Sequence, residues 1–71
     1  MIDRSKAGRR CRTNQFVRTV EGDLTKASTG TIRYEMENLG RSLVLVDWDR
    51  GFTVPVFPNE IEMLVENDAH P

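Results

Sequence analysis

The chain has 71 residues, of which 38% are hydrophobic and 30% are charged, and its formal net charge is −1. A chain of this length forms one small domain and buries only about 60% of the surface that its unfolded form exposes, which disfavours a large enclosed active site. No run is long and apolar enough for a membrane span, and the first residues lack the apolar segment of a secretory signal. The single Cys11 cannot form an internal disulfide, and we therefore expect a cytoplasmic protein.

The small net charge hides an uneven distribution along the chain. Residues 1–18 carry six basic residues and one acid, a balance of +5, whereas residues 19–71 carry four basic residues and ten acids, a balance of −6. Residues 1–12 also have almost no apolar content, which predicts a flexible basic arm. We predict a β-domain over residues 13–66 and a flexible polar tail over residues 67–71.

The first half of the predicted domain contains one weak and one clear strand signal. Residues 14–20 form a plausible first strand, and residues 21–30 read as a polar loop with turn formers at both ends. Residues 31–37 alternate strictly between apolar and polar side chains, as a half-buried strand does. This period places Ile32, Tyr34 and Met36 on one face.

The next strand is predicted over residues 42–49, after a reversal at residues 38–41 that contains Asn and Gly. Its β-branched and aromatic residues favour a strand over a helix. Either parity could face the core. We predict that Val44, Val46 and Trp48 point inward, because the opposite choice would bury the Asp47 carboxylate.

A second reversal at residues 49–51 leads into a strand over residues 52–57. Pro55 has no amide proton to donate to a ladder, so this strand should lie at an edge of the sheet or contain a bulge at that residue. Residues 58–62 read as one helical or 3₁₀ turn that brings Ile61 into the core. Residues 63–65 can form a short closing strand.

This order of elements resembles the SH3-like barrel. The resemblance is carried by the following stretches: Phe16 to Val20, Gly30-Thr31-Ile32, Val44-Leu45-Val46-Asp47-Trp48, Asp49-Arg50-Gly51 and Pro58-Asn59-Glu60-Ile61. It implies an all-β fold, a small five-stranded barrel with a 3₁₀ turn before the last strand. Among such barrels the chain is similar to accessory subunits of electron-transfer complexes, such as the variable chain of ferredoxin-thioredoxin reductase, and more loosely to KOW-type barrels.

No catalytic constellation stands out in the sequence. Cys11 lies among arginines that would favour its thiolate, but a reactive thiol needs a partner base, and the only histidine, His70, is at the far end of the chain. We interpret Cys11 as an incidental thiol and His70 as a tail residue. Asp47 and Asp49 flank Trp48 and share one side of a strand, which we interpret as a solvated face with Arg50 as counter-charge. We therefore assign no catalytic, metal or cofactor-binding residue and predict that the chain is not an enzyme.

Two surface features suggest partners. If Val44 and Val46 face the core, then Leu43 and Leu45 point outward beside Leu39, and such an apolar patch often marks a partner surface. The alternative is that the loop over residues 21–30 covers the patch through Leu24.

The second feature is the basic arm, which carries Arg4, Lys6, Arg9, Arg10 and Arg12. Such an arm either solubilises the chain or supplies phosphate contacts to nucleic acid. We hypothesise that the chain, as a monomer or weak dimer, is a non-catalytic interaction domain that docks on a larger protein; the alternative is a nucleic-acid-binding module that uses the arm.

Overall fold

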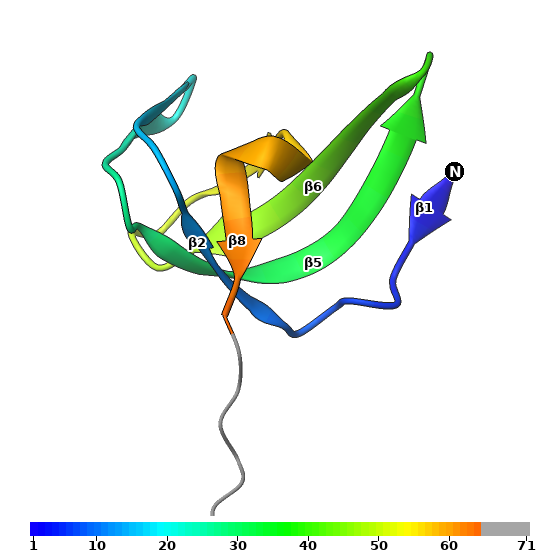
Figure 1. The fold of residues 1–71 in the computed structure, drawn as a ribbon, viewed down its shortest axis with the longest axis horizontal. Helices are drawn as coiled ribbons and strands as arrows, with labels where there is room; N and C mark the ends of the chain where they lie inside the picture. The colour runs from blue at the N-terminus through cyan, green and yellow to red at the C-terminus, as the bar shows by residue number, and fades with distance from the viewer. Residues whose placement is uncertain (65–71) are drawn as a thin grey trace, which may run out of the picture.

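The computed structural model describes residues 1–64, and it confirms the predicted all-β architecture (Figure 1). The strands are β1 (Ile2–Asp3), β2 (Arg10–Thr13), β3 (Val17–Thr19), β4 (Gly22–Leu24), β5 (Thr29–Asn38), β6 (Arg41–Trp48), β7 (Thr53–Val56) and β8 (Ile61–Met63), with one 3₁₀ turn, η1 (Pro58–Glu60), before β8. The predicted tail and Val65 of the predicted closing strand lie outside the described residues.

The larger sheet has the strand order β7-β6-β5-β2-β8, and all of its pairings are antiparallel. β5 is long enough to pair with β6 along one edge and with both β1 and β2, one after the other, along its other edge. β3 and β4 form a separate hairpin. In the part of the chain that the structure describes, β7 and β8 are each paired on one side only, so the sheet does not close into a barrel.

β5 contains a β-bulge that changes which side chains share a face. The register runs from the pair Ile32 and Val46 directly to the pair Tyr34 and Leu45, which leaves Arg33 as the extra residue. Beyond the bulge the parity is inverted, and Ile32 is buried while Tyr34 and Met36 are only half-buried. The prediction that these three residues share one face was therefore wrong, because the bulge rotates the second half of the strand. The curvature of β5 is visible in Figure 1.

The core lies on the concave side of the curved sheet. The predicted parity of β6 is confirmed, since Val44, Val46 and Trp48 are all at most 3% exposed. The β3–β4 hairpin caps this core with buried residues from both of its strands, Val17 and Leu24. The segment that was expected to be only a polar loop thus contains a strand. The full buried apolar set is Cys11, Val17, Leu24, Ile32, Val44, Val46, Trp48, Val54 and Val56.

The sheet begins earlier in the chain than residue 13, the predicted start of the domain. β2 lies between β5 and β8, and its alternating burial places Cys11 and Thr13 inside with Arg12 outside. Ahead of β2, the Gly8 amide donates to the Ile32 carbonyl over 2.8 Å. With only two inward side chains, neither of them large, β2 has too little apolar content for the sequence pattern to identify it.

The predicted edge position of the Pro55 strand is confirmed, because β7 ends the strand order and pairs only with β6. The Trp48 amide donates to the Phe52 carbonyl, and from this pair the antiparallel alternation turns the Pro55 nitrogen away from β6. The missing donor therefore costs no ladder hydrogen bond. Within residues 1–64, no helix is long and apolar enough to cross a membrane.

Candidate interaction surface

The turn between β5 and β6 presents an unusual apolar residue at its apex. Leu39 and Gly40 both have positive φ angles, +54° and +79°, as a type I′ hairpin turn requires. Glycine, asparagine and aspartate adopt this conformation readily, whereas a leucine pays a steric penalty. The Leu39 side chain is nevertheless 95% exposed. The hairpin tip projects beyond the rest of the sheet (Figure 1).

Behind this apex, four half-buried apolar side chains form one strip on the convex side of the hairpin. Tyr34 is paired with Leu45, and Met36 with Leu43, so the four side chains lie on the same face. We call Tyr34, Met36, Leu43 and Leu45 the outer strip. The structure thus places two sequence-predicted partner residues, Leu43 and Leu45, with two that were predicted to share a face with Ile32.

Leu24, which was considered as a cover for Leu43 and Leu45, is instead fully buried with the core residues. One side chain of the arm does reach the outer strip: the Arg4 guanidinium carbon lies 5.6 Å from the centre of the Tyr34 ring, in cation–π geometry. All four residues of the strip remain partly accessible.

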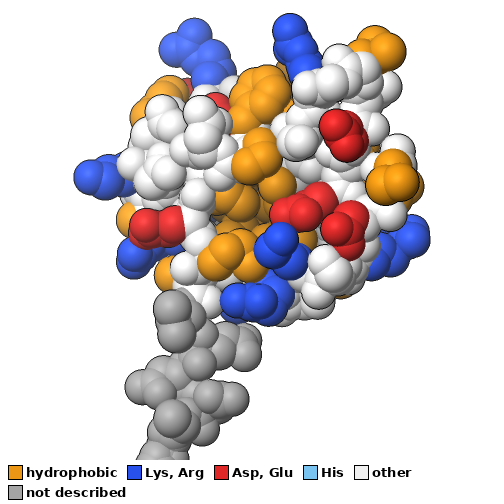
Figure 2. Space-filling model, turned by 45° about the vertical axis from the view of Figure 1, so that its right-hand side comes forward, with side chains coloured by type: hydrophobic (Ala, Val, Ile, Leu, Met, Phe, Trp, Pro, Cys, Tyr) orange, Lys and Arg blue, Asp and Glu red, His pale blue; other side chains and the backbone are white. Residues whose placement is uncertain are grey.

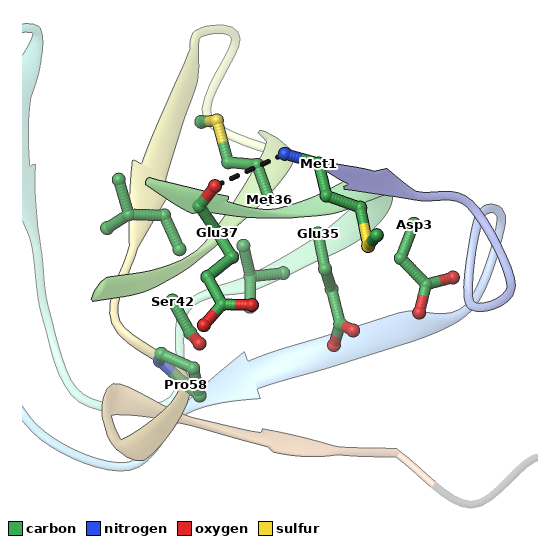
Figure 3. A pocket seen from close by; sticks show the side chains of 9 residues that line it. Met1, Asp3, Glu35, Met36, Glu37, Ser42 and Pro58 are labelled. Atoms are coloured by element: carbon green, nitrogen blue, oxygen red, sulfur yellow. Dashed lines mark hydrogen bonds between the residues drawn. The ribbon is translucent and has the colours of Figure 1, made fainter. Parts of the chain in front are cut away.

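The opposite, concave side of the same hairpin holds an open hollow of about 250 Å³. We call it the inner hollow; it is lined by Met1, Asp3, Glu35, Met36, Glu37, Ser42, Leu43, Val44 and Pro58. In Figure 3 the side chains of Asp3, Glu35 and Glu37 point into the same space, while Met36 points away from it. No local sequence pattern predicts this hollow, because its lining combines β1, the β5–β6 hairpin and η1.

A second hollow, of about 280 Å³, lies between the β3–β4 hairpin and the β7 edge. It is lined by Val17, Arg18, Thr19, Val20, Leu43, Val54, Pro55, Val56, Phe57 and Glu60. Phe57 is 42% exposed at the start of η1. Figure 2 shows one face of the molecule with a central hollow floored by hydrophobic side chains and acidic side chains beside it.

Most of the arm's basic side chains contact the domain itself. Lys6 forms an ion pair with Glu35 at 3.5 Å, and Arg12 forms one with Glu62 at 2.5 Å. Arg10 pairs with Asp49, and Arg4 lies over Tyr34. The arm therefore does not present a continuous set of free cations, and this weakens the case for a phosphate-binding surface.

The Arg10–Asp49 pair is the centre of a hydrogen-bond network across β2 and β5. The Arg10 guanidinium donates to both carboxylate oxygens of Asp49, over 3.0 and 2.5 Å, and to the Thr31 hydroxyl over 2.8 Å. The Thr29 hydroxyl donates to the same carboxylate over 2.7 Å. The bonds from Arg10, followed by that from Thr29, lower the pKa of Asp49 to about 2.

The counter-charge expected for the two aspartates was Arg50, and this expectation was wrong. Asp47 instead pairs with Arg33 at 3.5 Å and accepts from the Thr53 hydroxyl. The Arg50 guanidinium donates to the backbone carbonyl of Asp23. The strand pairings bring Arg10 and Arg33 to the aspartates from far along the sequence, whereas Arg50 lies in the turn and reaches the other hairpin.

The Asp49 network should make stability depend on pH. Because the folded pKa is depressed below 3.8, the carboxylate contributes its full stabilisation above that value and loses it as the pH falls through about 2. We expect Asp49→Asn to lower the urea midpoint modestly at pH 5, as for exposed ion pairs, and the difference from the parent to vanish near pH 2. Circular dichroism of urea unfolding measures this, with Glu21→Gln as the control. An unchanged difference from pH 5 to pH 2 would contradict the assignment.

Cys11 is fully buried, and burial raises the pKa of its thiol to about 11. The nearby arginines do not outweigh this effect, so the thiol is protonated and shielded at neutral pH. Within residues 1–64, no group of three or more histidine, cysteine, aspartate or glutamate side chains is placed to hold a metal ion. His70 lies outside the described residues.

Comparison of the chain with protein-family models, with curated proteins and with solved structures finds no match.

Proposed function

We propose that the chain is a non-catalytic protein-interaction domain of the SH3-like kind, which docks as an accessory domain on a larger protein or complex. The observation that carries the proposal is Leu39, a leucine with a φ of +54° and a side chain that is 95% exposed. In the isolated domain this residue is unfavourable twice, because its backbone is strained and its apolar surface is hydrated. Burial of Leu39 in a partner would recover the hydration cost.

The residues around Leu39 support the same conclusion. The outer strip begins at the third residue pair below the apex, with Met36 opposite Leu43. A projecting apolar anchor beside half-buried apolar side chains has the composition of an interface centre, where a few residues provide most of the binding energy. Leu45 and Tyr34 extend this surface toward the bulge.

The experiment that tests the proposal separates stability from binding in one substitution. Leu39→Asn places Asn-Gly, the preferred type I′ pair, at the apex, and should stabilise the fold by about 1 kcal/mol. The same change removes the anchor, and should reduce capture of the protein partner from nuclease-treated lysate of the source cells by tenfold or more, as for a hot spot of about 1.4 kcal/mol. Urea unfolding and quantitative affinity capture give the two readouts.

Val20→Asn is the matched control, since Val20 is 97% exposed at the tip of the β3–β4 hairpin. It should leave capture unchanged. A partner that Leu39→Asn retains and Val20→Asn loses would move the interface to the second hollow. Recovery of nucleic acid in place of protein, lost when residues 1–12 are deleted, would replace the proposal with the nucleic-acid alternative.

A further inference from the structure

The inner hollow differs from the outer strip in that charged side chains border its apolar surface. Val44 is buried at its base, and Pro58 of η1 and the Met1 side chain supply further apolar surface. Three carboxylates, from Asp3, Glu35 and Glu37, lie on its rim. A volume of about 250 Å³ is ample for one long side chain and too small for a folded element.

The three carboxylates are held together by strand pairing. Asp3 of β1 lies directly opposite Glu35 of β5, and Glu37 is two residues further along the same face. Like charges that face each other across two strands destabilise the pair. In Figure 3 the three carboxylates point to the same side of the strands, and that of Glu37 lies nearest to Ser42 and Pro58.

The domain's own contacts neutralise only part of this charge. Lys6 places its ammonium 3.5 Å from Glu35, and the Ser5 amide donates to Asp3 over 2.8 Å. Among residues 1–64, the structure gives the Glu37 carboxylate no ion-pair partner, and the Met1 ammonium donates to the Glu37 backbone carbonyl over 3.3 Å. The contact with Lys6 shows that the rim accommodates a lysine ammonium while leaving carboxylate oxygens for a second cation.

We infer that the inner hollow receives a lysine or arginine side chain from an extended basic segment of the partner protein, an inference that rests on the proposed function. The aliphatic stem of such a side chain packs on Val44 and Pro58, and its cationic end lies between Glu37 and Asp3. The outer strip and the inner hollow lie on opposite faces of one hairpin. The apex belongs to both faces. A partner that buries Leu39 at the apex is therefore close enough for a neighbouring residue of the partner to reach the rim.

The charge of the rim favours a basic side chain over a phosphate group, an acidic peptide or an apolar peptide. Phosphates of a nucleic acid or a lipid headgroup are repelled by the rim, where Lys6 pairs with only one of the three carboxylates, and an acidic peptide is repelled equally. An apolar peptide alone would leave the Glu37 carboxylate without a cationic partner. A basic side chain can do both: its aliphatic stem packs on the apolar base, and its cation pairs with the carboxylates.

The test uses two synthetic peptides and the ¹⁵N-labelled full chain. An acetylated, amidated hexapeptide of alternating lysine and leucine should shift the amide resonances of residues 35–44 with saturable binding, and raising the salt concentration should weaken it. The same peptide with glutamate in place of lysine should leave these resonances unchanged. Shifts of equal size with both peptides, or shifts confined to other residues, would overturn the inference.

Variants of the rim provide the second arm of the test. The double change Glu35→Gln/Glu37→Gln removes two like charges, so it should leave the domain folded, and it should weaken the lysine peptide about tenfold. The control Glu21→Gln/Asp23→Asn removes the same charge from the β3–β4 hairpin and should have little effect. Equal weakening by both pairs would show that only net charge is sensed and would overturn the inference. So would displacement of the peptide by spermidine at equal concentration, because it would show that cationic charge alone, without the rest of the peptide, is enough for binding.

Failure of this inference is distinguishable from failure of the proposed function. Suppose that Leu39→Asn abolishes capture of a protein partner while the lysine peptide does not bind the inner hollow. The proposed function is then supported, and the inferred site for a basic side chain is refuted. If Leu39→Asn leaves capture intact, the apex is not the docking element, whatever the peptide does.

Discussion

Trp48→Ala should remove about half of the domain's stability. The Trp48 side chain is only 3% exposed, and its indole nitrogen donates to the Val54 carbonyl over 3.3 Å. Truncation of a buried tryptophan to alanine typically costs 3–5 kcal/mol, through lost burial and the cavity that remains. A chain of this size has a free energy of unfolding of only about 4–10 kcal/mol. Urea unfolding followed by far-ultraviolet circular dichroism measures the loss, since the variant has no tryptophan fluorescence.

Trp48→Phe is the control that separates packing from hydrogen bonding. It keeps an aromatic ring in the core but leaves the Val54 carbonyl without its indole donor. We expect it to cost about 1–2 kcal/mol, well below the alanine variant. If alanine and phenylalanine destabilise equally, the hydrogen bond, and not the packing of the indole, would be the main contribution of Trp48.

The central part of the fold is predictable from the sequence because its patterns are local. Strict alternation and β-branched content identify β5 and β6, and the turn residues between them predict the reversal. Pro55 identifies an edge strand through a missing donor. Each of these signals is contained in fewer than ten residues and does not depend on the rest of the chain.

The bulge at Arg33 could not be predicted from the same pattern. Alternation across Ile32, Tyr34 and Met36 is what a regular strand would show, and the extra residue is revealed only by the partner strand. The bulge is nevertheless decisive for the surface, because it moves Tyr34 and Met36 to the side of Leu43 and Leu45. A local pattern thus identified the strand and assigned half of it to the wrong face.

The first twelve residues illustrate a different limit. Their composition is that of a disordered arm, yet β2 is an interior strand of the larger sheet, between β5 and β8. Arginines on its outward side form ion pairs with Asp49 and Glu62, which are distant in the sequence. A high content of charged residues predicts disorder. In the folded sheet, however, these charges form ion pairs on the exposed face.

The candidate site divides in the same way between local and distant information. Leu39 was named from the sequence because the parity of the strand over residues 42–49 leaves Leu43 and Leu45 pointing outward beside it. The inner hollow was not found, since Asp3 and Glu35 are 32 positions apart and meet only when β1 pairs with β5. Long-range strand pairing is the information that a single sequence lacks.

Gly30→Ala should destabilise the domain by about 1–2 kcal/mol, although glycine in a strand is usually unfavourable. Gly30 is buried and lies directly opposite Trp48. A Cβ at this position would lie 2.6 Å from the Val46 side chain, 2.8 Å from the Asp47 carbonyl oxygen and 2.9 Å from the indole. Overpacking of a rigid site costs about 1–3 kcal/mol, which outweighs the gain of about 0.4–1 kcal/mol from a less flexible unfolded chain.

A double-mutant cycle with Val46→Ala tests this explanation. Because Val46→Ala removes the closest contact, it should recover part of the cost of Gly30→Ala, giving a coupling of about 0.5–1 kcal/mol. Full recovery is not expected, since the Asp47 carbonyl belongs to the backbone of β6 and cannot move without breaking the ladder. The free energies of unfolding of the parent, the two single variants and the double variant measure the coupling. Strict additivity would mean that the sheet relaxes around the new methyl group, and that close packing of Trp48 on β5 does not require a glycine.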